Sequence, residues 1–170
     1  LIAQKGTDGI EKPMREIITS IVEPLRMNDD GTSFYDIVPI LSSAKDTSLE
    51  AFTKNGQLDL VPYTGSEFLD MEVIGDEIGD DHVFNFLYDW RLSHADVAAQ
   101  LHDYLAEVCA LTGHDKVSVY SISQGCLLLG VYMYEYPDDN YIDRAVFDTP
   151  LLAGSNLVSD LYTDKPISLN

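Results

Sequence analysis

The residue best suited to chemistry is Ser123, within SISQG at residues 121–125. The apolar run KVSVY precedes this segment and the apolar run CLLLG follows it, which predicts a buried strand, a sharp turn and a helix. A serine on such a turn stands clear of the sheet and is placed to attack an acyl carbon. The turn requires small residues two positions before and after the nucleophile, and Ser121 and Gly125 meet that requirement.

Gln124 opens the predicted helix directly after this serine. Its backbone N–H would point at a developing oxyanion, with the positive end of the helix dipole behind it. Two other interpretations remain. One is a small-residue turn in a domain without catalysis. The other is a phosphate-binding loop, which the single glycine and the lack of a following lysine disfavour. The placement between a buried strand and an apolar helix favours the nucleophile.

The elements that position this turn alternate along residues 66–170. Apolar runs at 82–88, 116–121 and 141–148 predict three strands, and helical patterns open at Ser93 and Gln124. We therefore predict an α/β fold: a parallel sheet with right-handed crossovers and helices on both faces. Functional groups in such sheets gather at the carboxyl ends of the strands. Those ends carry Tyr88–Arg91, the serine turn and Asp148–Pro150.

Residues 1–65 form an irregular N-terminal segment, which we assign to the same domain. A helix is predicted over 13–22, a turn over 28–33, a short extended run over 34–40 and a loop over 41–66. A further helical pattern covers 66–79. Cys109 and Cys126 lie in apolar helical patterns and are predicted to be buried free thiols.

The central motifs resemble the lecithin–cholesterol acyltransferase and lysosomal phospholipase family of α/β-hydrolases. That family has a Y-D-W-R segment after one strand and a nucleophile turn about thirty residues later. Tyr88–Arg91 match the first motif, and Ser123 and Gly125 match the second, within a stretch of about 83–157. Ser121 and Cys126 depart from the small residues that the family prefers there.

The resemblance implies that Ser123 forms an acyl-enzyme with an acyl ester, of the lipid class, and that the Gln124 amide supplies half of the oxyanion hole. The acyl group would pass to water or to an alcohol. Trp90 would line the acyl or head-group pocket, although packing beside an Asp89–Arg91 salt bridge is the simpler role for this loop. The resemblance also suggests an extracytoplasmic or secreted protein.

An activated serine in this fold is followed by an acid and then a histidine. All four histidines, His82, His94, His102 and His114, precede Ser123 and are interpreted as surface residues. Asp148 is the candidate acid. We therefore expect the chain to be the central part of a larger hydrolase or acyltransferase, incomplete at both ends and inactive alone. The alternative is a hydrolase-fold domain that serves binding or assembly without catalysis.

The net charge of −19, from 10 basic and 29 acidic residues, disfavours binding to nucleic acid or to anionic membranes. No apolar run approaches the length of a membrane span. The acidic stretch 70–81 is better interpreted as a solvated helix face than as a calcium site. We expect no cofactor and no metal. Exposed sheet edges would favour oligomerisation of the isolated piece.

Overall fold

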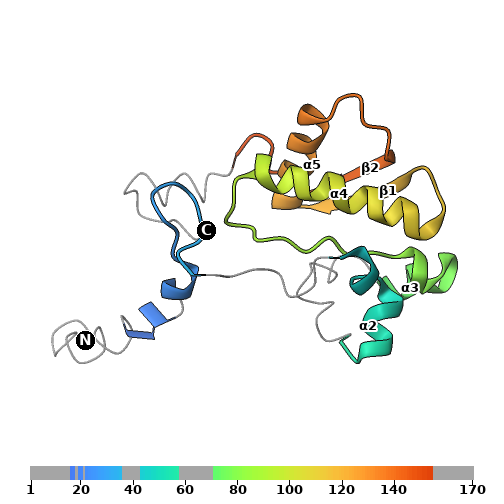
Figure 1. Cartoon of the computed structure of the whole chain (residues 1–170), viewed down its shortest axis with the longest axis horizontal. Coiled ribbons are helices and arrows are strands. Elements are labelled where there is room, and N and C mark those ends of the chain that lie inside the picture. The colour runs from blue at the N-terminus through green and yellow to red at the C-terminus, as the bar shows by residue number, and fades with distance from the viewer. Residues whose placement is uncertain (1–15, 18, 21, 36–42, 58–70, 155–170) are drawn as a thin grey trace, which may run out of the picture. The chain divides into compact units, whose positions relative to one another are not determined.

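The computed structural model describes residues 16, 17, 19, 20, 22–35, 43–57 and 71–154. The chain divides into two compact units, one comprising Leu1–Val38 with Asp89–Ser93 and the other Pro39–Tyr88 with His94–Asn170. The larger unit holds the helices and strands that are labelled in Figure 1. The predicted division at residue 65 stays a prediction.

The larger unit contains a parallel pair of strands, β1 (Val117–Ile122) and β2 (Ile142–Asp148). Their register places Ile122 opposite Asp148, so both strands end at the same edge. Helix α5 (Gln124–Glu135) connects them. The predicted order of strand, turn, helix and strand is therefore confirmed for residues 117–148, as is a mixed fold of helices and parallel strands.

Helix α4 (His94–Thr112) precedes β1 and buries the predicted apolar stripe. Its i, i+3 and i+4 spacing places these side chains on one face of the helix. Gly113, with φ of 71°, ends the helix in the left-handed conformation that glycine adopts without strain. The stripe is buried at Val97, Leu101, Tyr104, Leu105 and Val108.

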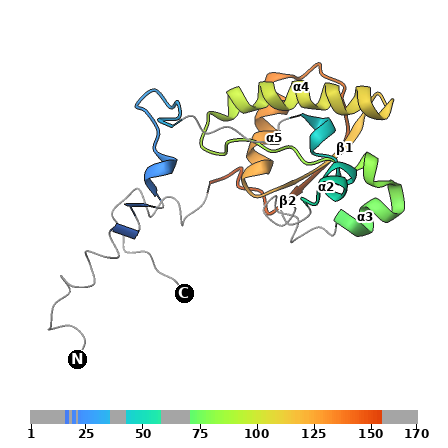
Figure 2. The same ribbon diagram turned by 60° about the horizontal axis from the view of Figure 1, so that its bottom comes forward.

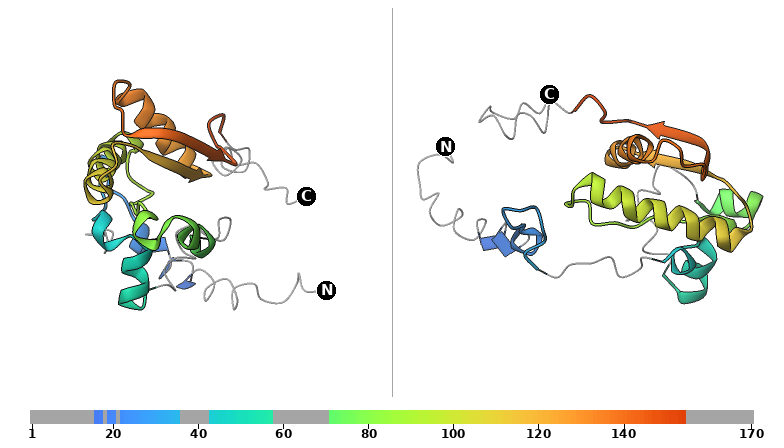
Figure 3. Two further views of the ribbon diagram at one scale, coloured as in Figure 1. Left: turned by 90° about the vertical axis from the view of Figure 1, so that its right-hand side faces the viewer. Right: turned by 45° about the horizontal axis from the view of Figure 1, so that its top comes forward.

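Helices α4 and α5 lie against the same face of the strands. Val117 packs against Tyr104 and Val108 of α4. Ser121, which points to the same side of β1 because side chains alternate along a strand, has its Oγ 3.5 Å from the Cys126 Sγ of α5. Figure 3 shows both helices on one side of the two strands. The predicted cover of helices on both faces of the sheet stays a prediction.

The predicted strand at 82–88 is wrong. This segment is extended, but its regular pairing is confined to one antiparallel bridge between Phe84 and Ser48. Backbone hydrogen bonds join Asn85 to Thr47 at 2.9 Å and Leu49 to Val83 at 2.8 Å. The segment runs alongside α4 (Figure 2), and its apolar residues pack there without a neighbouring strand of the sheet.

The predicted loop at 41–66 contains a helix, so that prediction is also wrong. A 3₁₀ turn at Ala44–Asp46 leads into α2 (Leu49–Asn55). The Ser48 hydroxyl accepts from the N–H of Ala51, and Gly56 ends the helix with φ of 65°. Leu49 and Phe52 of this helix form a small core with Met71 and Val83.

Helix α3 (Met71–Ile78) lies within the helix predicted over 66–79, and a 3₁₀ turn, Asp80–His82, follows it. In the smaller unit, residues 16, 17, 19, 20 and 22 are helical, as predicted, and a 3₁₀ turn follows at Glu23–Leu25. The predicted turn at 28–33 is confirmed: an antiparallel bridge joins Met27 to Ser33 around Gly31. Most of the extended run predicted over 34–40 lies outside the described residues.

Candidate active site at the ends of the two strands

Ser123 occupies the single position between β1 and α5, with φ of 51° and ψ of −115°. A side chain with a Cβ rarely adopts this conformation, which costs on the order of 1–3 kcal/mol unless the surroundings impose it. The half-buried serine also makes no capping hydrogen bond to the helix that it precedes. Its hydroxyl therefore does not cap the helix, which is the usual role of a serine at a helix N-terminus.

The strained turn is held by backbone hydrogen bonds on both sides. The N–H of Ser123 donates to the carbonyl of Asp148 at 3.0 Å, which ties the turn to the end of β2. The carbonyl of Ser123 accepts from the N–H of Cys126 at 3.1 Å, which ties it to the first turn of α5. The position of the serine is therefore set by the neighbouring strand and by its own helix.

Ser121 and Cys126 form a buried support behind the turn. The Ser121 hydroxyl donates to the carbonyl of Val146 at 2.9 Å, across the two strands. The Cys126 thiol is fully buried, 3.2 Å from the carbonyl oxygen of Asp148 and 3.3 Å from that of Ser121. The hydroxyl and the thiol thus replace smaller residues without leaving a buried polar group unpaired. Cys109 and Cys126 are both buried free thiols, as predicted.

Gly125 faces Ser121 where α5 leaves the strand. A Cβ built on Gly125 would lie 3.9 Å from the Cβ of Ser121, an ordinary van der Waals distance. The two predicted small positions therefore face each other, but the gap between them admits a methyl group.

Asp148 ends β2 with a half-buried side chain, and its Oδ2 accepts a hydrogen bond from the Tyr120 hydroxyl. This bond raises the pKa of the Tyr120 phenol, because ionisation would place two negative charges together. Thr149, the next residue, has φ of 46°. Among the described residues, Ser123 and Thr149 are the non-glycine residues with positive φ, and each directly follows one of the two paired strands.

Comparisons of the chain with models of known protein families, with curated proteins and with solved structures gave no match. The interpretation of this edge of the sheet therefore depends on its own geometry.

The structure brings three of the four predicted site residues to one edge. Ser123 and Asp148 are joined through the backbone, and Gln124 is the first residue of α5, at the positive end of the helix dipole. Tyr120 was missed. Its side chain contacts Asp148 because of the register in which β1 pairs with β2. The sequence does not indicate that register.

Trp90 belongs to the smaller unit, where its side chain is 56 % exposed. Its neighbours form the predicted structural salt bridge. Arg91 donates from Nε to Asp89 Oδ1 at 2.8 Å and from Nη2 to Oδ2 at 2.5 Å, and both side chains are buried. Arg91 also donates to Ser33 Oγ at 2.9 Å. The hydrogen bonds from Arg91 lower the pKa of Asp89.

The described histidine contacts lie away from the serine turn. His82 contacts Asp81 and the ring of His114. His102 contacts Asp103 and Asp139 and stacks on Tyr136. His82 and His114 are exposed, as predicted, whereas His94 and His102 are half-buried.

Two further features bear on the class of site. Across the described residues, no group of three or more His, Cys, Asp or Glu side chains is arranged to hold a metal ion. No described helix combines the length and the apolar character that crossing a membrane requires. The chemistry that the edge offers is that of a hydroxyl on a strained turn beside a helix N-terminus.

Proposed function

We propose that Ser123 is the nucleophile of a serine hydrolase or acyltransferase that acts on acyl esters of the lipid class. The observation that carries this proposal is the backbone of Ser123, a non-glycine residue held at φ of 51° and ψ of −115° between a parallel strand and a helix. Strain of this kind persists where the surroundings impose it, and it clusters at reactive residues. The strand–serine–helix turn is the arrangement that α/β-hydrolases use to present their nucleophile.

In the proposed reaction, the Ser123 Oγ attacks the acyl carbon and loses its proton to a general base. The carbonyl oxygen becomes an oxyanion, which the backbone N–H of Gln124 stabilises at the start of α5. Expulsion of the alcohol leaves an acyl-serine, and water or a second alcohol then takes the acyl group. The resemblance of YDWR and SISQG to the acyltransferase and phospholipase family supports the ester class and a complete α/β-hydrolase fold.

Asp148 is the candidate acid of this machinery because its carboxylate lies at the same edge as the serine. The base is a histidine in this fold, and the four histidines of the chain all precede Ser123. We therefore propose that the base is supplied by polypeptide other than these 170 residues. The chain alone should hydrolyse esters negligibly.

The test compares the 170-residue chain with the product of its complete reading frame, using a short-chain nitrophenyl ester. We expect hydrolysis by the complete product, loss of that activity in Ser123→Ala, and retained activity in the matched variant Ser121→Ala. Robust hydrolysis by the 170-residue chain that Ser123→Ala abolishes would show that the base lies within it. If the complete product hydrolysed the ester equally well with and without Ser123→Ala, the assignment of Ser123 as the nucleophile would be refuted.

The contacts of the histidines favour a second candidate function, a hydrolase-fold domain used for binding or assembly. His82 and His102 are engaged with acidic partners away from the turn. This alternative predicts that the complete product also fails to hydrolyse or transfer any acyl ester, although Ser123 keeps its strained conformation.

A further inference from the structure

The backbone carbonyl that holds the serine turn belongs to a peptide group with a strained neighbour. This carbonyl, of Asp148, accepts from the N–H of Ser123 at 3.0 Å and lies 3.2 Å from the thiol of Cys126. The same peptide group continues into Thr149, whose φ is 46°. A positive φ is an outlier for a β-branched residue, so Thr149 is strained. The contact that fixes the turn therefore depends on a peptide group that would relax by rotating.

Rotation of the peptide group between Asp148 and Thr149 would change the serine turn. A planar peptide group rotates as a unit about the bonds on its two sides, which here are ψ of Asp148 and φ of Thr149. The rotation would carry Thr149 towards the negative φ that residues with a Cβ prefer. It would also turn the carbonyl away from the N–H of Ser123. The observed arrangement therefore requires a contact that holds Asp148 in place.

The Tyr120 hydroxyl supplies such a contact by donating to Oδ2 of Asp148. In the register of the two strands, Tyr120 lies opposite Val146, so its hydroxyl reaches a residue two positions further along β2. The hydrogen bond raises the pKa of the phenol, which keeps the proton that it donates. No cation among the described residues lies within ion-pair distance of the Asp148 carboxylate. In the described part of the chain, Tyr120 is therefore the residue that anchors this side chain.

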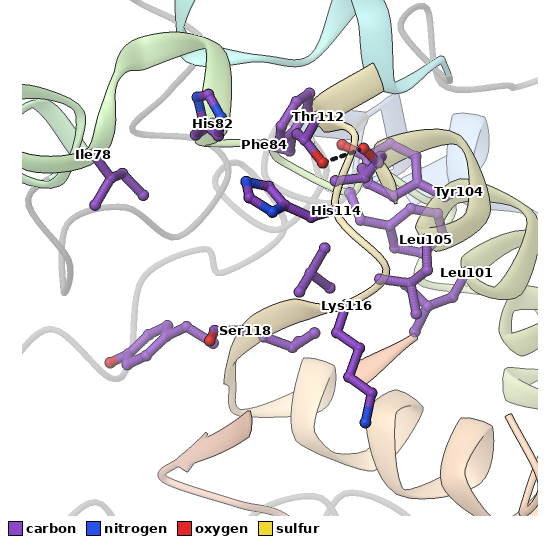
Figure 4. Close-up of a pocket in the computed structure, with 15 residues that line it drawn as sticks. Ile78, His82, Phe84, Leu101, Tyr104, Leu105, Thr112, His114, Lys116 and Ser118 are labelled. Atoms are coloured by element: carbon purple, nitrogen blue, oxygen red, sulfur yellow. Dashed lines mark hydrogen bonds between the residues drawn. The ribbon is translucent and has the colours of Figure 1, made fainter. Parts of the chain in front are cut away.

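Tyr120 also lines an apolar cavity of about 350 Å³ beside β1. Figure 4 shows this cavity with Ser118 of the same strand. Neither Ser123 nor Asp148 lines the cavity, so it is separate from the serine turn. Tyr120→Phe would keep the aromatic ring and remove the hydroxyl alone. This variant therefore separates the hydrogen bond to Asp148 from the packing of the ring.

We propose that Tyr120 is a positioning residue for the nucleophile: its hydroxyl anchors Asp148, and the carbonyl of Asp148 then holds Ser123 in its strained conformation. This inference rests on the proposed function of Ser123. It does not depend on Asp148 also serving as the acid, because Asp148 acts on the turn through its backbone. Loss of the Tyr120 hydroxyl should displace the nucleophile and leave the groups that bind the ester in place.

The first measurement is hydrogen exchange of the Ser123 amide in the 170-residue chain. We expect Tyr120→Phe to speed this exchange roughly tenfold, because the loss of one hydrogen bond to a carboxylate frees the peptide group to rotate. The amide of Val117 donates to the carbonyl of Tyr141 at the other end of the strand pair, at 2.8 Å, and should keep its parent rate. Unchanged exchange of Ser123 overturns the proposal. Equal acceleration at both amides also overturns it, since that indicates a general loss of stability.

Asp148→Ala removes the other partner of the same hydrogen bond, and it decides the case if Tyr120→Phe does not fold. It should speed the exchange of the Ser123 amide to the same extent, and the double variant should exchange no faster than either single variant. Unchanged exchange in Asp148→Ala, or additive effects of the two substitutions, would overturn the proposal. The matched control Tyr134→Phe, at an exposed tyrosine of α5, should leave the exchange at its parent rate.

The second measurement is hydrolysis of a short-chain nitrophenyl ester by the product of the complete reading frame. We expect Tyr120→Phe to lower kcat roughly tenfold at unchanged KM, because the hydroxyl positions the nucleophile and does not bind the ester. Tyr134→Phe should keep the parent kcat. A parent kcat in Tyr120→Phe, together with loss of activity in Ser123→Ala, overturns the positioning role and leaves the nucleophile assigned. Hydrolysis that Ser123→Ala leaves intact refutes the proposed function itself, and with it the role of Tyr120.

Discussion

The backbone N–H of Ser123 donates to the carbonyl of Asp148 at 3.0 Å. The last residue of β2 therefore fixes the turn that follows β1. The same carbonyl lies 3.2 Å from the thiol of Cys126. A backbone conformation that a serine rarely adopts is thus imposed by contacts with β2 and α5. The strain at Ser123 follows from these contacts.

Replacing Ser123 by glycine should stabilise the fold relative to replacing it by alanine. Glycine adopts positive φ without strain, whereas alanine retains the Cβ and therefore the strain. After the entropic cost of glycine in the unfolded chain, we expect Ser123→Gly to exceed Ser123→Ala by about 1 kcal/mol in free energy of unfolding. Urea denaturation of both variants measures this difference. Equal stability would mean that the turn is not strained.

Gly125→Ala should be tolerated and slightly stabilising. Its methyl group meets Ser121 at 3.9 Å, and alanine is favoured over glycine within a helix by roughly 0.5–1 kcal/mol. Gly125→Leu should destabilise, since a larger side chain has no space against the strand. Thermal unfolding of the two variants provides the comparison. A destabilised Gly125→Ala would show that the strand and helix approach more closely than the structure has them.

Asp89 should titrate below the ordinary aspartate pKa of about 3.9, because Arg91 stabilises its ionised form. A carboxyl whose pKa is lowered on folding contributes stability above its unfolded pKa and loses it as the pH falls through the folded value. Carbon-detected NMR of the carboxyl follows the titration. Arg91→Gln should raise the Asp89 pKa, whereas the exposed control Asp138→Asn should leave it unchanged. An Asp89 titration that is insensitive to Arg91→Gln would contradict the buried pair.

Tyr120 should titrate above the ordinary tyrosine pKa of about 10, because its hydroxyl donates to the Asp148 carboxylate. A raised pKa contributes stability below the unfolded value, and this contribution is lost as the pH rises through the folded value. Asp148→Asn should lower the Tyr120 pKa, as followed by the NMR shift of the ring carbons in alkaline titration. The exposed control Asp138→Asn should leave the Tyr120 pKa unchanged.

Local pattern was sufficient to predict much of this architecture. The apolar stripe of α4, its end at Gly113, and the strand, turn and helix around Ser123 all depend on neighbours within a few residues. The helix at Leu49–Asn55 was missed although Ser48 and Gly56 carried ordinary capping signals. The segment at 83–88 has the composition of a strand, but a strand also needs a partner along its edge, and composition does not supply one. The register between β1 and β2 could not be predicted from the sequence either, so the contact between Tyr120 and Asp148 was not predicted.

The most direct test of the central claim is covalent labelling of the complete reading-frame product with a fluorophosphonate, followed by mass spectrometry of its peptides. Such reagents form a stable adduct with an activated serine nucleophile. We predict one adduct on Ser123, unchanged in Ser121→Ala and absent in Ser123→Ala. An adduct on another serine, with Ser123 unmodified in a folded and catalytically active product, would contradict the assignment of Ser123 as the nucleophile.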